Sequence, residues 1–345
     1  SDFEIGKNSI KVNDLLLKEG KSEIFLNNLL IKDKKLSRFN MIKVKTFNKN
    51  DELNNDFVID FSEKLKIYGS KYDATNLTNA FDNNKSNNFF NNLNKDISIK
   101  IDEINSKVSN QLSNFNLVGS ISKGKFNKIV SKGEFDQNKY LEISLREDKV
   151  SKMKILEVYS DLPKPLLSNY KFFDGLSGGN LLLNSYYNSQ ISNSQLVIEN
   201  FKVKNAPNFV KLLSLADFGG MADALSGEGL SFEKLEMKME KNKKVLNLKE
   251  LYAIGPSISI LMEGYVVSDT GLVSLRGTMV PAKTLNKFLS KVPIVGDILI
   301  PKEIGEGLFG ISFKMKGLPG KIKTSVNPIK TLTPRFIQKA LKKTK

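Results

Sequence analysis

Apolar and polar residues alternate along several stretches of the C-terminal half of the chain. In KLEMKMEK, Leu235, Met237 and Met239 fall on one side of an extended backbone, and Lys and Glu residues fall on the other. The stretches VSLRGTMV (273–280) and GISFKMKG (310–317) repeat this period of two. A period of two is typical of a β-strand with one covered and one wet face. Each stretch therefore predicts a half-buried strand.

The segments next to these stretches are short and rich in turn-forming residues. They read KNKK (241–244), SDTG (268–271) and LPGK (318–321). Short connections of this kind join neighbouring antiparallel strands. The pattern predicts an antiparallel meander in this half of the chain.

The first two hundred residues contain a degenerate duplication. Three pairs of similar segments follow one another in the same order: SIKVND (9–14) and SIKIDE (98–103), RFNMIKVKTF (38–47) and KFNKIVSKGEF (125–135), KLKIYGSKYD (64–73) and KMKILEVYSD (152–161). Repeated units of strands bury their apolar faces only by stacking on their neighbours. We therefore expect a partial β repeat in residues 1–80 and a second repeat in residues 97–206 that continues the same sheet.

Between these repeats, residues 81–96 are rich in Asn, a composition typical of a solvated loop. Residues 207–345 form the third predicted region, in the order helix, β-meander, helix, two strands and terminal helix. Its first helical part, residues 206–229, should hold one or two short helices that begin near Pro207 and break at Gly219 and Gly220. Residues 282–292 predict another short amphipathic helix.

The last residues, TLTPRFIQKALKKTK (331–345), predict a terminal amphipathic helix. Thr333 is a suitable N-cap and Pro334 occupies the first helical position. An apolar stripe is bordered by basic side chains. Such a helix can lie in a membrane interface or pack its stripe on the end of a sheet.

These patterns predict a mainly β protein with a few short helices. Its long strands are numerous and its helices are too few to cover them, which favours an elongated, twisted antiparallel sheet with an open apolar side. A closed β-sandwich, in which a second sheet covers the apolar faces, is the alternative.

Composition and charge limit the kinds of partner and the kinds of chemistry that the chain can have. The formal net charge of +16 points to an anionic partner, either a membrane surface or a nucleic acid. The chain has no Cys and no His, so thiolate chemistry, imidazole bases and imidazole metal ligands are excluded. GSISKGKF (119–126) matches a phosphate-binding loop only in part, because Phe126 stands where a Ser or Thr should bind Mg²⁺. We expect no enzyme, no metal and no cofactor.

A set of ordered motifs carries a resemblance to a known family. The motifs LSGEGLSF, GPS, LRGTMVPA, KVPIVGD, GEGLFG and SVNP occur in this order over roughly residues 170–340. In this order they resemble the C-terminal region of the AsmA-like envelope proteins of Gram-negative bacteria, in particular the YhdP-like members. The upstream part resembles that family only in its strand pattern.

The resemblance implies a sheet folded over into an apolar groove (a β-taco) that moves phospholipid between the inner and outer membranes. It also implies a place in the periplasm, as the C-terminal part of a protein anchored in the inner membrane. The expected partners are phospholipid acyl chains, an anionic membrane surface and envelope proteins, and no nucleic acid. The other two hypotheses are an envelope assembly protein with a closed β-sandwich and a basic nucleic-acid-binding protein.

Two sets of residues follow from this hypothesis. The lipid groove is predicted to be lined by Leu235, Met237, Met239, Leu246, Leu248, Ile258, Ile260, Val273, Leu275, Met279, Ile311, Phe313 and Met315. Contact with a membrane is predicted for Ile294, Val295, Ile298, Leu299, Arg335, Phe336, Ile337, Lys339, Leu341, Lys342 and Lys343.

Overall fold

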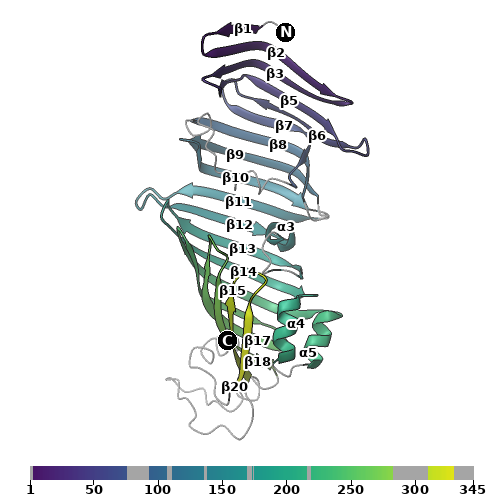
Figure 1. Cartoon of the computed structure of the whole chain (residues 1–345), viewed down its shortest axis with the longest axis vertical. Helices are drawn as coiled ribbons and strands as arrows, with labels where there is room; N and C mark the ends of the chain where they lie inside the picture. The colour runs from purple at the N-terminus through teal and green to yellow at the C-terminus, as the bar shows by residue number, and fades with distance from the viewer. Residues whose placement is uncertain are drawn as a thin grey trace. The chain divides into compact units, whose positions relative to one another are not determined.

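The computed structural model of the chain is mainly β, as the alternating pattern predicts (Figure 1). It describes residues 3–75, 93–106, 111–135, 138–168, 173, 175–215, 219–282 and 310–329. These residues contain twenty strands and three short helices. The chain divides into two units, Ser1–Pro165 and Leu166–Lys345.

The first unit is one sheet in which neighbouring strands are mostly consecutive and antiparallel. Its strands are β1 (Phe3–Gly6), β2 (Ser9–Glu19), β3 (Ser22–Lys32), β4 (Lys35–Arg38), β5 (Met41–Phe47), β6 (Leu53–Asp60), β7 (Leu65–Asp73), β8 (Lys95–Asn105), β9 (Leu112–Ser122), β10 (Lys125–Phe135), β11 (Lys139–Glu147) and β12 (Lys154–Ser160). A short helix, α3 (Pro163–Leu167), follows β12. Strands β7 and β8, on the two sides of the Asn-rich stretch, pair parallel.

The second unit is an antiparallel meander, β13 to β20. Its elements are β13 (Leu176–Tyr187), β14 (Ile191–Val203), α4 (Pro207–Leu215), α5 (Gly219–Ser226), β15 (Leu230–Asn242), β16 (Val245–Ile254), β17 (Ile258–Val267), β18 (Val273–Pro281), β19 (Gly310–Gly317) and β20 (Lys323–Ile329). All twenty strands belong to one sheet. Among the described strands of either unit, the last does not pair back with the first, so the sheet is open in both units.

The helices between β14 and β15 correct one sequence expectation. Two short helices form and the first begins at Pro207, as predicted, but Gly219 is the first residue of α5 rather than the break between the helices. Apart from Ala282, the helix predicted for 282–292 lies outside the described residues. The terminal helix predicted for 331–345 and the Asn-rich segment up to residue 92 also lie outside them.

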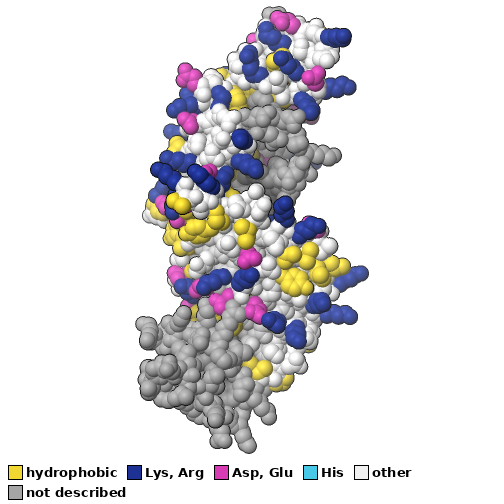
Figure 2. All heavy atoms as spheres, turned by 90° about the vertical axis from the view of Figure 1, so that its left-hand side faces the viewer, with side chains coloured by type: hydrophobic (Ala, Val, Ile, Leu, Met, Phe, Trp, Pro, Cys, Tyr) yellow, Lys and Arg dark blue, Asp and Glu magenta, His cyan; other side chains and the backbone are white. Residues whose placement is uncertain are grey.

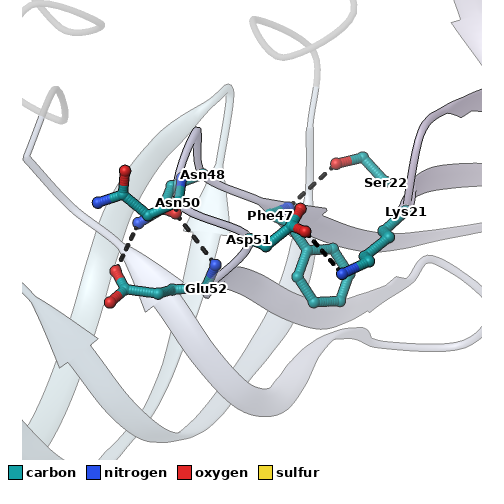
Figure 3. A network of polar contacts seen from close by, with 7 residues as sticks. All are labelled: Lys21, Ser22, Phe47, Asn48, Asn50, Asp51 and Glu52. Carbon is teal, nitrogen blue, oxygen red and sulfur yellow. Dashed lines mark hydrogen bonds and ion pairs between the residues drawn. The ribbon is translucent and has the colours of Figure 1, made fainter.

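Side-chain hydrogen bonds close the hairpins of the first unit. At the β5–β6 turn, the Asn48 side-chain oxygen accepts bonds from the backbone N–H groups of Asn50 (2.9 Å) and Glu52 (3.1 Å) (Figure 3). Asn and Asp favour turns because their side chains replace the missing backbone partners in this way. The Lys21 ammonium lies 2.7 Å from the Asp51 carboxylate, which ties the β2–β3 turn to the same hairpin.

An unusual backbone conformation recurs at regular intervals. Asn28 in β3, Asn114 in β9 and Asn200 in β14 have φ values of 56°, 52° and 55°, in the left-handed region. Each follows the previous one by 86 residues (28 to 114, 114 to 200). The recurrence marks three related strands, two of which (β9 and β14) lie within the predicted second repeat.

Candidate functional site

The predicted groove residues share one side of the sheet in the second unit, the apolar face. Residues paired across neighbouring strands point to the same side of a sheet. The pairing runs from Leu235 through Ala253 and Ile260 to Met279 and Ile311. The remaining predicted residues fall on the same side, in the rows Met237–Leu251–Met262–Gly277–Phe313, Met239–Leu248–Gly264–Leu275–Met315 and Leu246–Val266–Val273, and Ile258 begins the same alternation in β17.

Coverage of the apolar face changes along the strands. At the strand ends from which α4 and α5 connect β14 to β15, Ile258 and Met279 are 0% exposed and Ile311 is 2% exposed, whereas Ile260 of the same row is half-buried. Six strand positions further along, at the end where the hairpins lie, Leu246 and Val273 are only half-buried, as are Met239, Leu275 and Met315. The face is therefore closed at its helix end and partly accessible at its hairpin end.

Two helices, α4 and α5, lie at this end of the second unit, where they connect β14 to β15. Helices α4 and α5 contact each other, α4 contacts β20, and α5 contacts β15. In Figure 1 the pair lies beside the strands of the second unit. Leu212 and Leu213 of α4 are buried, as expected for an amphipathic helix packed on a sheet.

The opposite side of this sheet is polar toward the hairpin end, whereas toward the helix end it buries Tyr252, Ile254 and Val280. Lys234 pairs with Glu199 at 3.7 Å, Lys238 with Glu236 at 3.6 Å, and Arg276 contacts Glu263 through Nε and a second nitrogen at 2.8 and 2.6 Å. These pairs are largely exposed, so each stabilises the sheet by at most about 1 kcal/mol. Their main effect is solubility of this side toward the hairpin end, where the half-buried part of the apolar face is the candidate binding surface.

The same apolar side continues on strands that the sequence hypothesis did not include. Leu181, Leu196 and Ile198 on β13 and β14 are buried and share the row positions of Met237 and Leu235. The first unit has a similar side, with Ile97, Leu117 and Leu145 buried. LVIENF (196–201) begins with three consecutive apolar residues, so a period of two did not mark Leu196 and Ile198 in the sequence. Figure 2 shows apolar side chains gathered in patches with Lys and Arg side chains around them.

A polar cluster interrupts the apolar face near the β13–β14 hairpin. The hydroxyls of Ser185, Ser192 and Ser194 lie 2.8 to 3.2 Å from one another. Ser185 is buried, and Tyr187, opposite Ser192, has its pKa raised because burial disfavours the phenolate. This hydroxyl cluster lies between the apolar rows and the hairpin turn.

Neither the partial phosphate-binding motif at 119–126 nor the neighbouring acids Asp102 and Glu103 lie in a structural context typical of a reactive site. GSISKGKF forms the β9–β10 hairpin, with turn residues 123–124 and no following helix. Asp102 and Glu103 are exposed, and Glu103 pairs with Lys71. Among the described residues, no group of three acidic side chains could hold a metal ion.

All predicted membrane-contact residues, at 294–299 and 335–343, lie outside the described residues. Within the described part, no helix has the length and apolar character needed to cross a bilayer. Comparison of the chain with protein-family models, curated proteins and solved structures gives no match.

Proposed function

We propose that the apolar face binds the acyl chains of phospholipids and supports their movement across an aqueous space without chemical change. The observation that carries this proposal is that the predicted groove residues lie on one side of an open sheet. Those near the hairpin end are only half-buried. The motifs that resemble AsmA-like proteins support a place in the periplasm, between the inner and outer membranes of the envelope.

The physical reason for such a face is the cost of exposing lipid to water. A phospholipid with about 30 methylenes loses on the order of 20 kcal/mol when its chains enter water, at about 0.8 kcal/mol per CH₂. A continuous apolar surface removes most of this barrier. Neither a reactive side chain nor a cofactor is needed for that task.

The experiment measures phospholipid bound to the purified chain after incubation with phosphatidylglycerol vesicles and re-isolation. The double variant Met239→Asp/Leu275→Asp places charge on the half-buried part of the apolar face. We expect it to retain at least fivefold less lipid than the parent chain while its melting temperature falls by only a few degrees. The matched control is Leu182→Asp on the opposite side, where the side chain is 42% exposed, and we expect this variant to retain lipid.

Two results would overturn the proposal. The first is the absence of bound lipid in the parent chain. The second is loss of folding in Met239→Asp/Leu275→Asp, because charge buried in a closed core cannot be solvated. That second result would favour the closed β-sandwich.

A further inference from the structure

The meander places four of its turns at the same end of the second unit. In a run of antiparallel strands, alternate connections lie at the same end of the sheet. The turns of β13–β14, β15–β16, β17–β18 and β19–β20 therefore line one end, which we call the hairpin rim. The described residues of the rim are these turns and the two strand residues on either side of each.

The hairpin rim is strongly basic. It contains six lysines and one acidic residue, Asp269; the lysines are Lys241, Lys243, Lys244, Lys316, Lys321 and Lys323. All seven side chains belong to exposed residues. Within the described part of the chain, none of the six lysines lies in an ion pair, whereas Lys234, Lys238 and Lys249 on the strands do.

The described residues at the opposite end of the same sheet do not share this charge. Its described connections and the two strand residues beside each contain Lys202, Lys204 and Lys211 against Asp223 and Glu228. Among the described residues of the second unit, the basic excess therefore lies at the end where the apolar face is most accessible.

Three surfaces thus follow one another along the strands. The closed apolar rows come first, the half-buried rows and the hydroxyl cluster of Ser185, Ser192 and Ser194 come next, and the lysines come last. Lys241 shows the continuity, because its Cα partners are Ser192 and Leu246 of the apolar side. From Leu235 to Lys241 the strand covers about 20 Å, at about 3.3 Å per residue. One leaflet of a bilayer has a hydrocarbon depth of about 15 Å, half of the core thickness.

From this order we infer that the hairpin rim recognises the phosphate of a phospholipid whose acyl chains lie along the apolar face toward α4 and α5. Lysine ammonium groups bind phosphate oxygens as point charges. The inference rests on the proposed function and deepens it, because it assigns the orientation of the bound lipid and a preference for phosphate-bearing lipids over neutral ones.

The test compares binding of phosphatidylglycerol with binding of diacylglycerol that has the same acyl chains and no phosphate. The rim variant is Lys241→Gln/Lys243→Gln/Lys244→Gln, and the matched control is Lys202→Gln/Lys204→Gln/Lys211→Gln at the opposite end. We expect the rim variant to bind phosphatidylglycerol about tenfold more weakly and diacylglycerol with unchanged affinity. The control should bind both lipids like the parent chain, and added salt should weaken phosphatidylglycerol binding in the parent more than in the rim variant.

The outcomes separate this inference from the function on which it rests. If the parent chain binds both lipids equally, or if both triple variants weaken phosphatidylglycerol equally, the rim assignment is wrong and the apolar face stands. If neither lipid binds, both proposals fail. Glycerol 3-phosphate is the probe for the headgroup alone: displacement of phosphatidylglycerol by millimolar glycerol 3-phosphate would overturn the lipid as ligand and leave a soluble phosphate in its place.

Discussion

At the scale of the residue, three asparagines determine how the long strands keep one side covered. Leu26 and Leu29, Leu112 and Phe115, and Ile198 and Phe201 are each three positions apart, and every one of these side chains is buried or half-buried. In a regular strand, residues three apart point to opposite sides. A left-handed Asn lies between the members of each pair, where it interrupts the regular alternation of sides.

The first prediction concerns Asn200. A β-branched residue in the left-handed region is strained by about 1–2 kcal/mol, whereas Gly has no Cβ to clash. We expect Asn200→Val to lower the free energy of unfolding by about that amount and Asn200→Gly to change it by less than about 1 kcal/mol, measured by urea denaturation. The control Asn193→Val lies in a regular, exposed part of the same strand and should be neutral. Equal effects at positions 193 and 200 would contradict this account.

A second residue-scale prediction concerns pH. Burial raises the pKa of Tyr252 to about 12. Because the folded pKa lies above the ordinary value of about 10, the folded state binds more protons between these values. Stability from this group is complete below about pH 10 and is lost as pH rises toward 12. Unfolding of Tyr252→Phe should therefore depend less on pH between 9 and 11.5 than unfolding of the parent chain, and parallel pH profiles would refute the assignment.

At the scale of the element, a single ammonium group stabilises the passage from β7 to β8. Lys95 begins β8 and donates hydrogen bonds to the carbonyls of Phe61 (3.1 Å), Ser62 (2.6 Å) and Glu63 (3.2 Å) in the β6–β7 turn. Its ammonium also lies 5.2 Å from the centre of the Phe61 ring. These contacts fix the first residue of β8 to the turn that precedes β7, its parallel partner.

We therefore expect Lys95→Met to destabilise the chain by about 1–3 kcal/mol, the typical effect of removing hydrogen bonds to a charged donor. Lys100→Met on the exposed side of β8 is the control and should change stability by less than about 0.5 kcal/mol. Thermal unfolding of the two variants gives the comparison. Similar losses in both would mean that the turn contacts contribute nothing.

Much of the element structure could be predicted from the sequence. The strands containing KLEMKMEK and VSLRGTMV form as expected because one period of two spans each of them, and their Asn-, Asp- and Gly-containing turns are short. The two faces of β16 were harder to predict, since Tyr252 and Ile254 are buried together with Leu251 and Ala253. The Asn kinks were missed because an apolar pair spaced by three residues matches neither regular period.

At the scale of the whole molecule, the proposed function requires that one side of an open sheet bind a ligand. The sequence located this side in the second unit because the alternation is regular there. The hairpin rim could not be predicted from the sequence. Its turns are far apart in the chain, and only the strand pairing places them at the same end of the sheet. The proposed orientation of a bound lipid therefore rests on the strand topology rather than on a sequence motif.

The most direct measurement is photocrosslinking of bound lipid from two neighbouring residues on opposite sides of β13. Leu183 lies on the apolar side with Leu196, and Leu182 lies on the polar side with Val197. A benzoylphenylalanine is introduced at each position in turn, the chain is loaded with phosphatidylglycerol, and covalent adducts are quantified by mass spectrometry after illumination. The account predicts lipid adducts at position 183 and at most background at position 182. Equal adduct yields at both positions, or none at 183 in a folded chain, would contradict it.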